Sequence, residues 1–105
     1  MSDYIIVFVT TNSAKEAKKI SRTLVEEKLA ACCNIISPIQ SIYQWQGKIC
    51  EDKEILIMLK TKKKLFKQVD TRVRELHSYE VPEVISIPIV EGSDKYMSWL
   101  KNETK

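Results

Sequence analysis

The sequence predicts an α+β fold because stretches with strand periodicity and helix periodicity alternate along the chain. Four stretches are rich in β-branched or alternating apolar residues, and three repeat their apolar residues at helical spacing, in the order β-α-β-β-α-β-α. A length of 105 residues, with 44% apolar and 30% charged residues, suits one globular domain. A chain of this length buries roughly 60 to 70% of its unfolded surface. We therefore expect a single domain over residues 1–105.

The first β-α unit is expected within residues 4–25. Residues 4–10 form a near-continuous apolar run, typical of a central strand that is covered on both faces. Ser13 and Glu16 form an S-x-x-E capping box, which predicts the start of the first helix. Apolar residues then recur at helical spacing at Ala14, Ala17, Ile20, Leu24 and Val25.

A long hairpin is expected next. Residues 31–43 read as a strand with an irregularity at Ser37-Pro38, and residues 49–61 read as a buried strand. Gln46-Gly47-Lys48 is the turn signal between them. Both arms are longer than the first strand, so the hairpin tip should project past the body of one subunit.

The second helix and the last strand flank a loop that contains the only histidine. Leu65, Val69, Val73 and Leu76 repeat at helical spacing, which predicts a helix that stops near His77. Val84, Ile85, Ile87, Ile89 and Val90 are β-branched and suit a strand buried on at least one face. Pro88 lacks an N–H, so this strand should lie at a sheet edge or carry a bulge.

The C-terminal stretch predicts a short helix capped by Ser93, with Tyr96, Trp99 and Leu100 on its apolar side. Two β-α-β units with right-handed crossovers then give a four-stranded sheet with both main helices on one face, the ferredoxin-like arrangement. The other sheet face stays bare unless the last helix or other copies of the chain cover it. Tyr43 and Trp45 near the hairpin tip are also typical of subunit interfaces. We therefore expect an oligomer.

Charge and cysteine content limit the partners and the compartment. The net charge is +3, from 17 basic and 14 acidic residues, and a nucleic-acid-binding face usually carries a larger local excess. No stretch reads as a signal peptide or a membrane span, and three cysteines without a secretory signal favour reduced thiols. We expect a cytoplasmic protein that binds neither nucleic acid nor membrane. The basic residues gather as a solvated helix start at Lys60, Lys62, Lys63, Lys64 and Lys67.

Five separated motifs carry a resemblance to a known family. They are Leu29-Ala30-Ala31-Cys32 with Asn34, Ser41-x-Tyr43-x-Trp45-x-Gly47, Glu54 with Lys60-Thr61, His77-x-Tyr79-Glu80-Val81-Pro82-Glu83, and Tyr96-x-x-Trp99. In this order they resemble the CutA family of small divalent-cation tolerance proteins, along almost the whole chain. The resemblance implies a homotrimer related in shape to the PII signalling proteins, with the long hairpin joining neighbouring subunits. It also implies an association with copper and other divalent metals, without enzymatic activity and without a required cofactor.

The candidate metal ligands are His77, Cys32 and Glu83. Thiolates select Cu(I), imidazole suits Cu(II) or zinc, and carboxylates are harder donors. Some bacterial CutA members have a cysteine near the end of the first strand and a His-His pair, and only His77 of that set is present here. The competing interpretation, which we favour, is that His77 is a helix-end imidazole satisfied by a backbone carbonyl or by the helix C-terminal dipole. Cys32 and its neighbour Cys33 should point to opposite faces of a strand and so not share one ion.

Two other functions remain open beside a metal-binding trimer. One is a PII-like sensor that binds a small anion between subunits, with Lys60, Lys62 and His77 supplying charge. The other is a scaffold trimer. The residues expected at the subunit interface or cleft are Tyr43, Trp45, Lys60, Tyr79 and Trp99.

Overall fold

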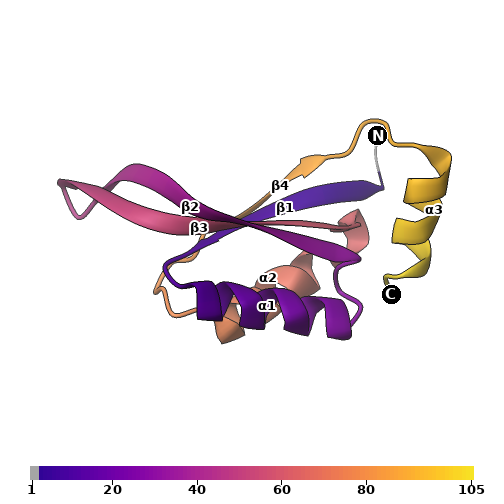
Figure 1. Ribbon diagram of the computed structural model, residues 1–105, viewed down its shortest axis with the longest axis horizontal. Coiled ribbons are helices and arrows are strands. Elements are labelled where there is room, and N and C mark those ends of the chain that lie inside the picture. Colours follow the sequence, from indigo (N-terminus) through magenta and orange to yellow (C-terminus); the bar gives the residue numbers. More distant parts are fainter. Residues whose placement is uncertain (1–2) are drawn as a thin grey trace.

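The computed structural model describes residues 3–105 and has an antiparallel four-stranded sheet with helices packed on one face (Figure 1). The strand order is β2-β3-β1-β4, so the first strand is central, as predicted. The predicted α+β class and element order are confirmed; residues 1 and 2 of the predicted domain lie outside the described part. The elements are β1 (Tyr4–Thr11), α1 (Ala14–Glu26), β2 (Cys32–Trp45), β3 (Lys48–Lys62), the 3-10 turn η1 (Lys63–Leu65), α2 (Phe66–Leu76), β4 (Val84–Pro88) and α3 (Asp94–Asn102).

The hydrophobic core lies between the sheet and the two main helices, α1 and α2. Alternate residues of the central strands β1 and β3 point into it, because side chains of a strand alternate between its two faces. Burying each such side chain contributes about 1.5–3 kcal/mol relative to leaving it in water. The fully buried core residues include Val7, Val9, Ile20, Leu24, Ile57, Leu59, Val69 and Val73.

The start of α1 follows the predicted cap only in part. Ser13 Oγ accepts a hydrogen bond from the Glu16 amide at 3.0 Å, as predicted for an N-cap. The Glu16 carboxylate does not return to Ser13. It accepts instead from Thr11 and from Ser78, which follows α2. Glu16 therefore joins three elements rather than closing a capping box.

The β2–β3 hairpin has arms of 14 and 15 residues and extends well beyond the helices (Figure 1). Its turn residues Gln46 and Gly47 have φ angles of 51° and 76°, as the favoured two-residue hairpin turns require. The strand register shifts between Ile36 and Ile39, where Ser37-Pro38 predicted an irregularity. These features confirm the predicted hairpin.

The strand β4 lies at the sheet edge, as Pro88 predicted, and pairs only with β1. The expectation that its β-branched residues are buried is wrong for one subunit, because Ile85 and Ile87 are 54% and 47% exposed. Both point away from α1 and α2. They belong to an apolar surface, here named the open sheet face, formed by Ile6, Phe8, Ile36, Leu56, Met58, Ile85 and Ile87.

The chain by itself covers only one face of its central strands, as expected from a sheet with both main helices on one side; the covering of β1 on its second face stays a prediction. Within β1, Ile6 and Phe8 are half-buried, whereas Val7 and Val9 are fully buried. The physical reason is that α1 and α2 pack on the same side of the sheet (Figure 1).

The last helix, α3, lies beside the end of the sheet, near the start of β1 (Figure 1). Leu100 is fully buried, while Tyr96 and Trp99 are each 41% exposed. Ser93 occupies the N-cap position, but its side chain makes no capping hydrogen bond, so that part of the prediction is wrong. None of the helices within residues 3–105 is long and apolar enough to cross a membrane.

Candidate functional site

His77 directly follows α2 and its side chain is completely buried. Its Nε2 lies 2.7 Å from the Thr10 carbonyl oxygen, and its Nδ1 accepts a hydrogen bond from the Tyr79 amide at 3.0 Å. A carbonyl only accepts and an amide N–H only donates, so these two contacts fit the tautomer with its proton on Nε2; Nδ1 also lies 3.5 Å from the Glu16 carboxylate. The geometry thus supports the helix-end alternative, because in this position neither ring nitrogen has a lone pair free for a metal.

Glu16 stabilises the loop that contains His77 by accepting hydrogen bonds from it. Its carboxylate accepts from the Thr11 hydroxyl, from the Ser78 amide at 3.1 Å and from the Ser78 hydroxyl at 3.2 Å. Its side chain is only 15% exposed. Hydrogen bonds to a carboxylate are among the stronger ones in proteins. The end of β1, the start of α1 and the loop after α2 are therefore held in one hydrogen-bonded network.

Tyr79 connects this network to a groove beside the hairpin. Its ring lies against that of His77, with centroids 4.6 Å apart, and its hydroxyl donates to Glu54 at 2.5 Å. Burial and the bond to Glu54 raise the pKa of Tyr79 well above its usual range. The hollow of about 690 Å³, here named the hairpin groove, is lined by Thr10, Gln40, Ser41, Ile42, Tyr43, Trp45, Glu54, Tyr79, Glu80, Val81 and Glu83.

The hairpin groove is acidic, because three glutamates and no basic residue line it. Glu54 is 8% exposed, and its carboxylate accepts a hydrogen bond from the Tyr79 hydroxyl. Burial, and then the charge of Glu54, raise the pKa of Glu83 above its ordinary value. Glu54 and Glu83 line the same hollow, and a nearby like charge disfavours ionisation of a carboxyl group. A cation between them would relieve this repulsion.

Aromatic side chains from the hairpin complete the groove. Tyr43 and Trp45 are 41% and 43% exposed, and the Tyr43 hydroxyl donates to Asp52. That hydrogen bond, followed by burial, raises the pKa of Tyr43 to about 12. Of the five predicted interface or cleft residues, Tyr43, Trp45 and Tyr79 therefore lie together in the groove.

The other predicted residues lie elsewhere. The Lys60 amino group donates to Asn34 Oδ1 on the neighbouring strand, and Trp99 packs against Tyr96 on α3, with ring centroids 5.4 Å apart. Lys62 pairs with Tyr4 at one end of β1, whereas His77 binds Thr10 at the other end. One subunit thus does not gather Lys60, Lys62 and His77 into an anion site.

The three predicted metal ligands are also separated within one subunit. Cys32 Sγ lies 3.6 Å from the Tyr96 hydroxyl, His77 is enclosed by the network at Thr10, and Glu83 lies in the hairpin groove. Within residues 3–105, no group of three or more His, Cys, Asp and Glu side chains is placed to hold a metal ion. A metal site at any one of these residues would need further donors from outside the set.

In the sequence, Glu54 stands out only as part of a motif, and Glu16 only as part of a helix cap. A signal for Glu54 was present: it directly precedes the apolar run of residues 55–59, where a carboxylate is costly to bury without a partner. For Glu16 no local signal existed, because its partner Ser78 is 62 positions away.

Cys33 is predicted to be the least reactive of the three free thiols. Its Sγ faces α1, 3.7 Å from the Ser21 carbonyl oxygen, which confirms that Cys32 and Cys33 point to opposite faces. Burial raises the pKa of Cys33 to about 12. Since the thiolate is the reactive form, we expect iodoacetamide at pH 8 to alkylate Cys33 at least ~10-fold more slowly than Cys50. Peptide mass spectrometry after timed labelling measures this, with labelling in urea as control; equal native rates would contradict the prediction.

Comparison with known proteins agrees with the resemblance read from the motifs. A family model described as CutA1 divalent ion tolerance protein matches residues 5–103. The chain is 46% identical to the chloroplastic protein CutA of Arabidopsis thaliana over 101 residues, which cover 96% of this chain and 56% of the relative. It is 44% identical to the divalent-cation tolerance protein CutA of Thermus thermophilus over 94% of this chain and 96% of the relative.

Comparison of the structure with solved structures points to the same family. The solved structure of the divalent cation tolerance protein Cut A1 from Thermus thermophilus superposes with a TM-score of 0.95 at 43% identity. The superposition covers 97% of this chain and 99% of the solved chain. The chain thus spans nearly all of the Thermus protein, but little more than half of the Arabidopsis relative. The chain belongs to the CutA1 divalent ion tolerance protein family.

Proposed function

We propose that this chain forms a cytoplasmic homotrimer that binds divalent cations, copper among them, and contributes to metal tolerance without catalysing a reaction. The observation that carries the proposal is the hairpin groove, a hollow lined by Glu54, Glu80 and Glu83 and by no basic residue. Family membership supplies the link to divalent ions.

The donors of the groove suit a hard or borderline cation. Carboxylate oxygens are the ligands preferred by Mg²⁺, Ca²⁺ and Mn²⁺, and they also bind Zn²⁺ and Cu²⁺. Two neighbouring carboxylates form only part of a coordination shell. In the proposed site, water or a neighbouring subunit supplies the remaining donors, and Glu54 and Glu83 hold the ion.

A soft Cu(I) site has less support within one subunit. The raised pKa of Cys33 disfavours its thiolate, and both nitrogens of His77 are engaged. Cys32 stays available at the edge of the open sheet face beside Tyr96. A threefold axis could bring three copies of Cys32 or Glu83 together, which is how the predicted ligands would act in a trimer.

The open sheet face supports the homotrimer. Seven apolar side chains make up this face, next to Thr10, Asn34 and Lys60, and contiguous apolar surface marks interaction sites in soluble proteins. The strand order β2-β3-β1-β4 is that of a ferredoxin-like sheet, which supports the PII-like assembly proposed with it. In that assembly the sheets of three subunits face inward, and the projecting hairpins contact neighbours through Tyr43 and Trp45.

Titration calorimetry of the wild-type chain with Cu(II), Zn(II) and Mn(II) tests the cation site. We expect saturable binding of at least one ion, weakened about 10-fold or more by Glu83→Gln. The matched control is Glu91→Gln, which removes the same charge from an exposed residue outside the groove. Unchanged affinity in Glu83→Gln would contradict the site, and no saturable binding of any ion would contradict the function.

The pH dependence of binding follows from the raised pKa of Glu83. As the pH falls toward that pKa, a proton occupies the carboxylate and the cation must displace it. We expect binding about 3-fold or more weaker at pH 5 than at pH 7, measured by the same titration. Glu83→Gln should lose most of this pH dependence, and a flat profile in the wild type would argue against Glu83 as a ligand.

A further inference from the structure

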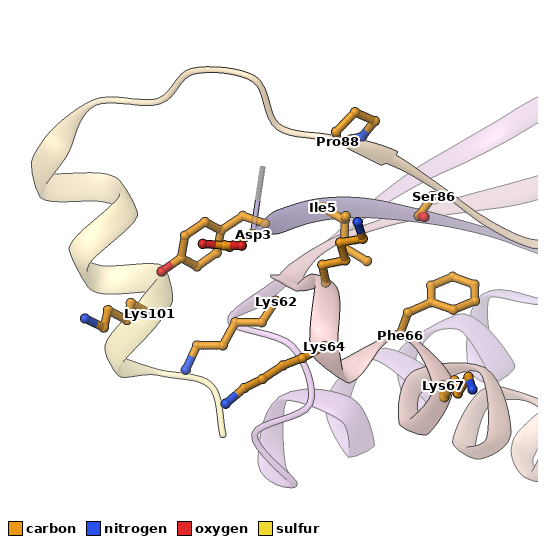
Figure 2. Close-up of a pocket in the computed structure, with 11 residues that line it drawn as sticks. Asp3, Ile5, Lys62, Lys64, Phe66, Lys67, Ser86, Pro88 and Lys101 are labelled. Atoms are coloured by element: carbon orange, nitrogen blue, oxygen red, sulfur yellow. The ribbon is translucent and has the colours of Figure 1, made fainter. Parts of the chain in front are cut away.

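A second hollow, of about 970 Å³, lies at the end of β1 opposite His77 (Figure 2). We name it the lysine pocket. It combines residues from both central strands, from β4, from the start of α2 and from α3. Its lining contains five lysines and one aspartate: Lys62, Lys63, Lys64, Lys67, Lys101 and Asp3.

Among residues 3–105, none of these lysines forms an ion pair with an aspartate or glutamate side chain, although Asp3 also lines the pocket. The Lys62 amino group donates instead to the main-chain oxygens of Lys105 at 2.9 Å and Thr104 at 3.3 Å. Burial, and then the charges of Lys64 and Lys101, lower the pKa of Lys62. The charges of Lys64 and Lys101 thus disfavour the charged form of Lys62, and an anion in the pocket would offset that effect.

The position of the lysines in the fold is itself unfavourable. Lys63 and Lys64 lie in η1, which leads directly into α2, and neither segment has an acidic residue in its first turn or a side-chain cap. Helix starts usually favour negative charge, because the helix dipole is positive there. The sequence alone suggested a solvated helix start, whereas the structure places these lysines around a hollow.

The other side of the pocket is apolar. Figure 2 shows Ile5 of β1 and Phe66 of α2 on the side away from Lys101, with Pro88 of β4 above them. The volume is within the range of pockets for small molecules, which are roughly 300–1,000 Å³. A bare inorganic anion would leave this apolar wall unused. A long nucleic acid would need a broad basic surface rather than one hollow.

We propose that the lysine pocket binds a small organic polyanion, with clustered phosphate-like charges against Lys62, Lys64 and Lys101 and an aromatic or apolar body against Phe66 and Ile5. This inference is independent of the cation site in the hairpin groove. The two hollows lie at opposite ends of β1 and share no lining residue.

Calorimetric titration of the full chain with ATP and with inorganic tripolyphosphate, both free of added metal, tests the proposal. We expect both probes to bind saturably, ATP about 3-fold or more tightly than tripolyphosphate, and both more weakly at high salt. Lys64→Gln with Lys101→Gln should weaken both probes about 10-fold or more. Both side chains are exposed and have no hydrogen bond among the described residues, so the fold should be retained.

The matched control is Lys19→Gln with Lys95→Gln, which removes the same charge from exposed positions outside the pocket. Its affinity for both probes should stay within about 2-fold of the wild type. Equal weakening in both double variants would overturn the proposal in favour of a general attraction to a basic chain. Absence of saturable binding, or equal affinity for ATP and tripolyphosphate, would also overturn it.

Discussion

Replacing His77 by alanine is expected to lower the free energy of unfolding by about 3–5 kcal/mol, because a fully buried ring with two hydrogen bonds is lost. The Thr10 carbonyl and the Tyr79 amide would lose their partner, and the Tyr79 ring would lose its neighbour. Urea unfolding followed by tryptophan fluorescence measures the change. The predicted loss is a large part of the typical stability of a domain.

The control for this prediction is Glu80→Ala in the same loop. Glu80 is exposed and makes no hydrogen bond among the described residues, so its replacement should change the unfolding free energy by less than about 0.5 kcal/mol. A His77→Ala chain as stable as the wild type would show that the buried network does not hold the loop. His77 would then regain its place as a candidate ligand.

Replacing Ile87 by glutamate is expected to convert the proposed trimer into monomers. Ile87 is 47% exposed in a single subunit, so the glutamate can stay hydrated there and the subunit should still fold. In a trimer built through the open sheet face, the carboxylate would be buried without a partner, at a cost of several kcal/mol. Since each 1.4 kcal/mol is a factor of ten, assembly should weaken more than about 100-fold.

Light scattering at a fixed protein concentration measures the mass of this variant, and circular dichroism checks that the subunit is folded. Gln68→Glu is the matched control, because it adds the same charge to an exposed residue of α2, in the helical layer. It should keep the wild-type mass. An Ile87→Glu chain that remains a trimer would place the interface elsewhere on the molecule.

Local patterns were sufficient to predict most of the fold. The apolar run in β1, the turn at Gln46-Gly47 and the edge position of Pro88 each depend on neighbouring residues. The predictions that were wrong concern features that depend on residues far away along the chain. Ile85 and Ile87 look like core residues in the sequence; they are exposed because they point to the sheet face opposite both main helices, and their strand composition alone does not say which face that is.

The candidate site was predicted less completely for the same reason. The motifs pointed to Tyr43, Trp45 and Tyr79, and the fold does bring these together in the hairpin groove. The hydrogen bond between His77 and Thr10 joins residues 67 positions apart, so the local periodicity of helices and strands cannot predict it. The lysine cluster was visible in the sequence, but its concave setting arises from β4 and α3, which are distant in the chain.

Native mass spectrometry of the wild-type chain, with and without one equivalent of Cu(II) per subunit, tests the central claim most directly. It reports the number of subunits and the number of bound ions in one spectrum. We predict a trimer that gains bound copper, with the gain lost in Glu83→Gln and retained in Glu91→Gln. A monomer, or a trimer that takes up no more copper than the Glu83→Gln variant, would contradict the account.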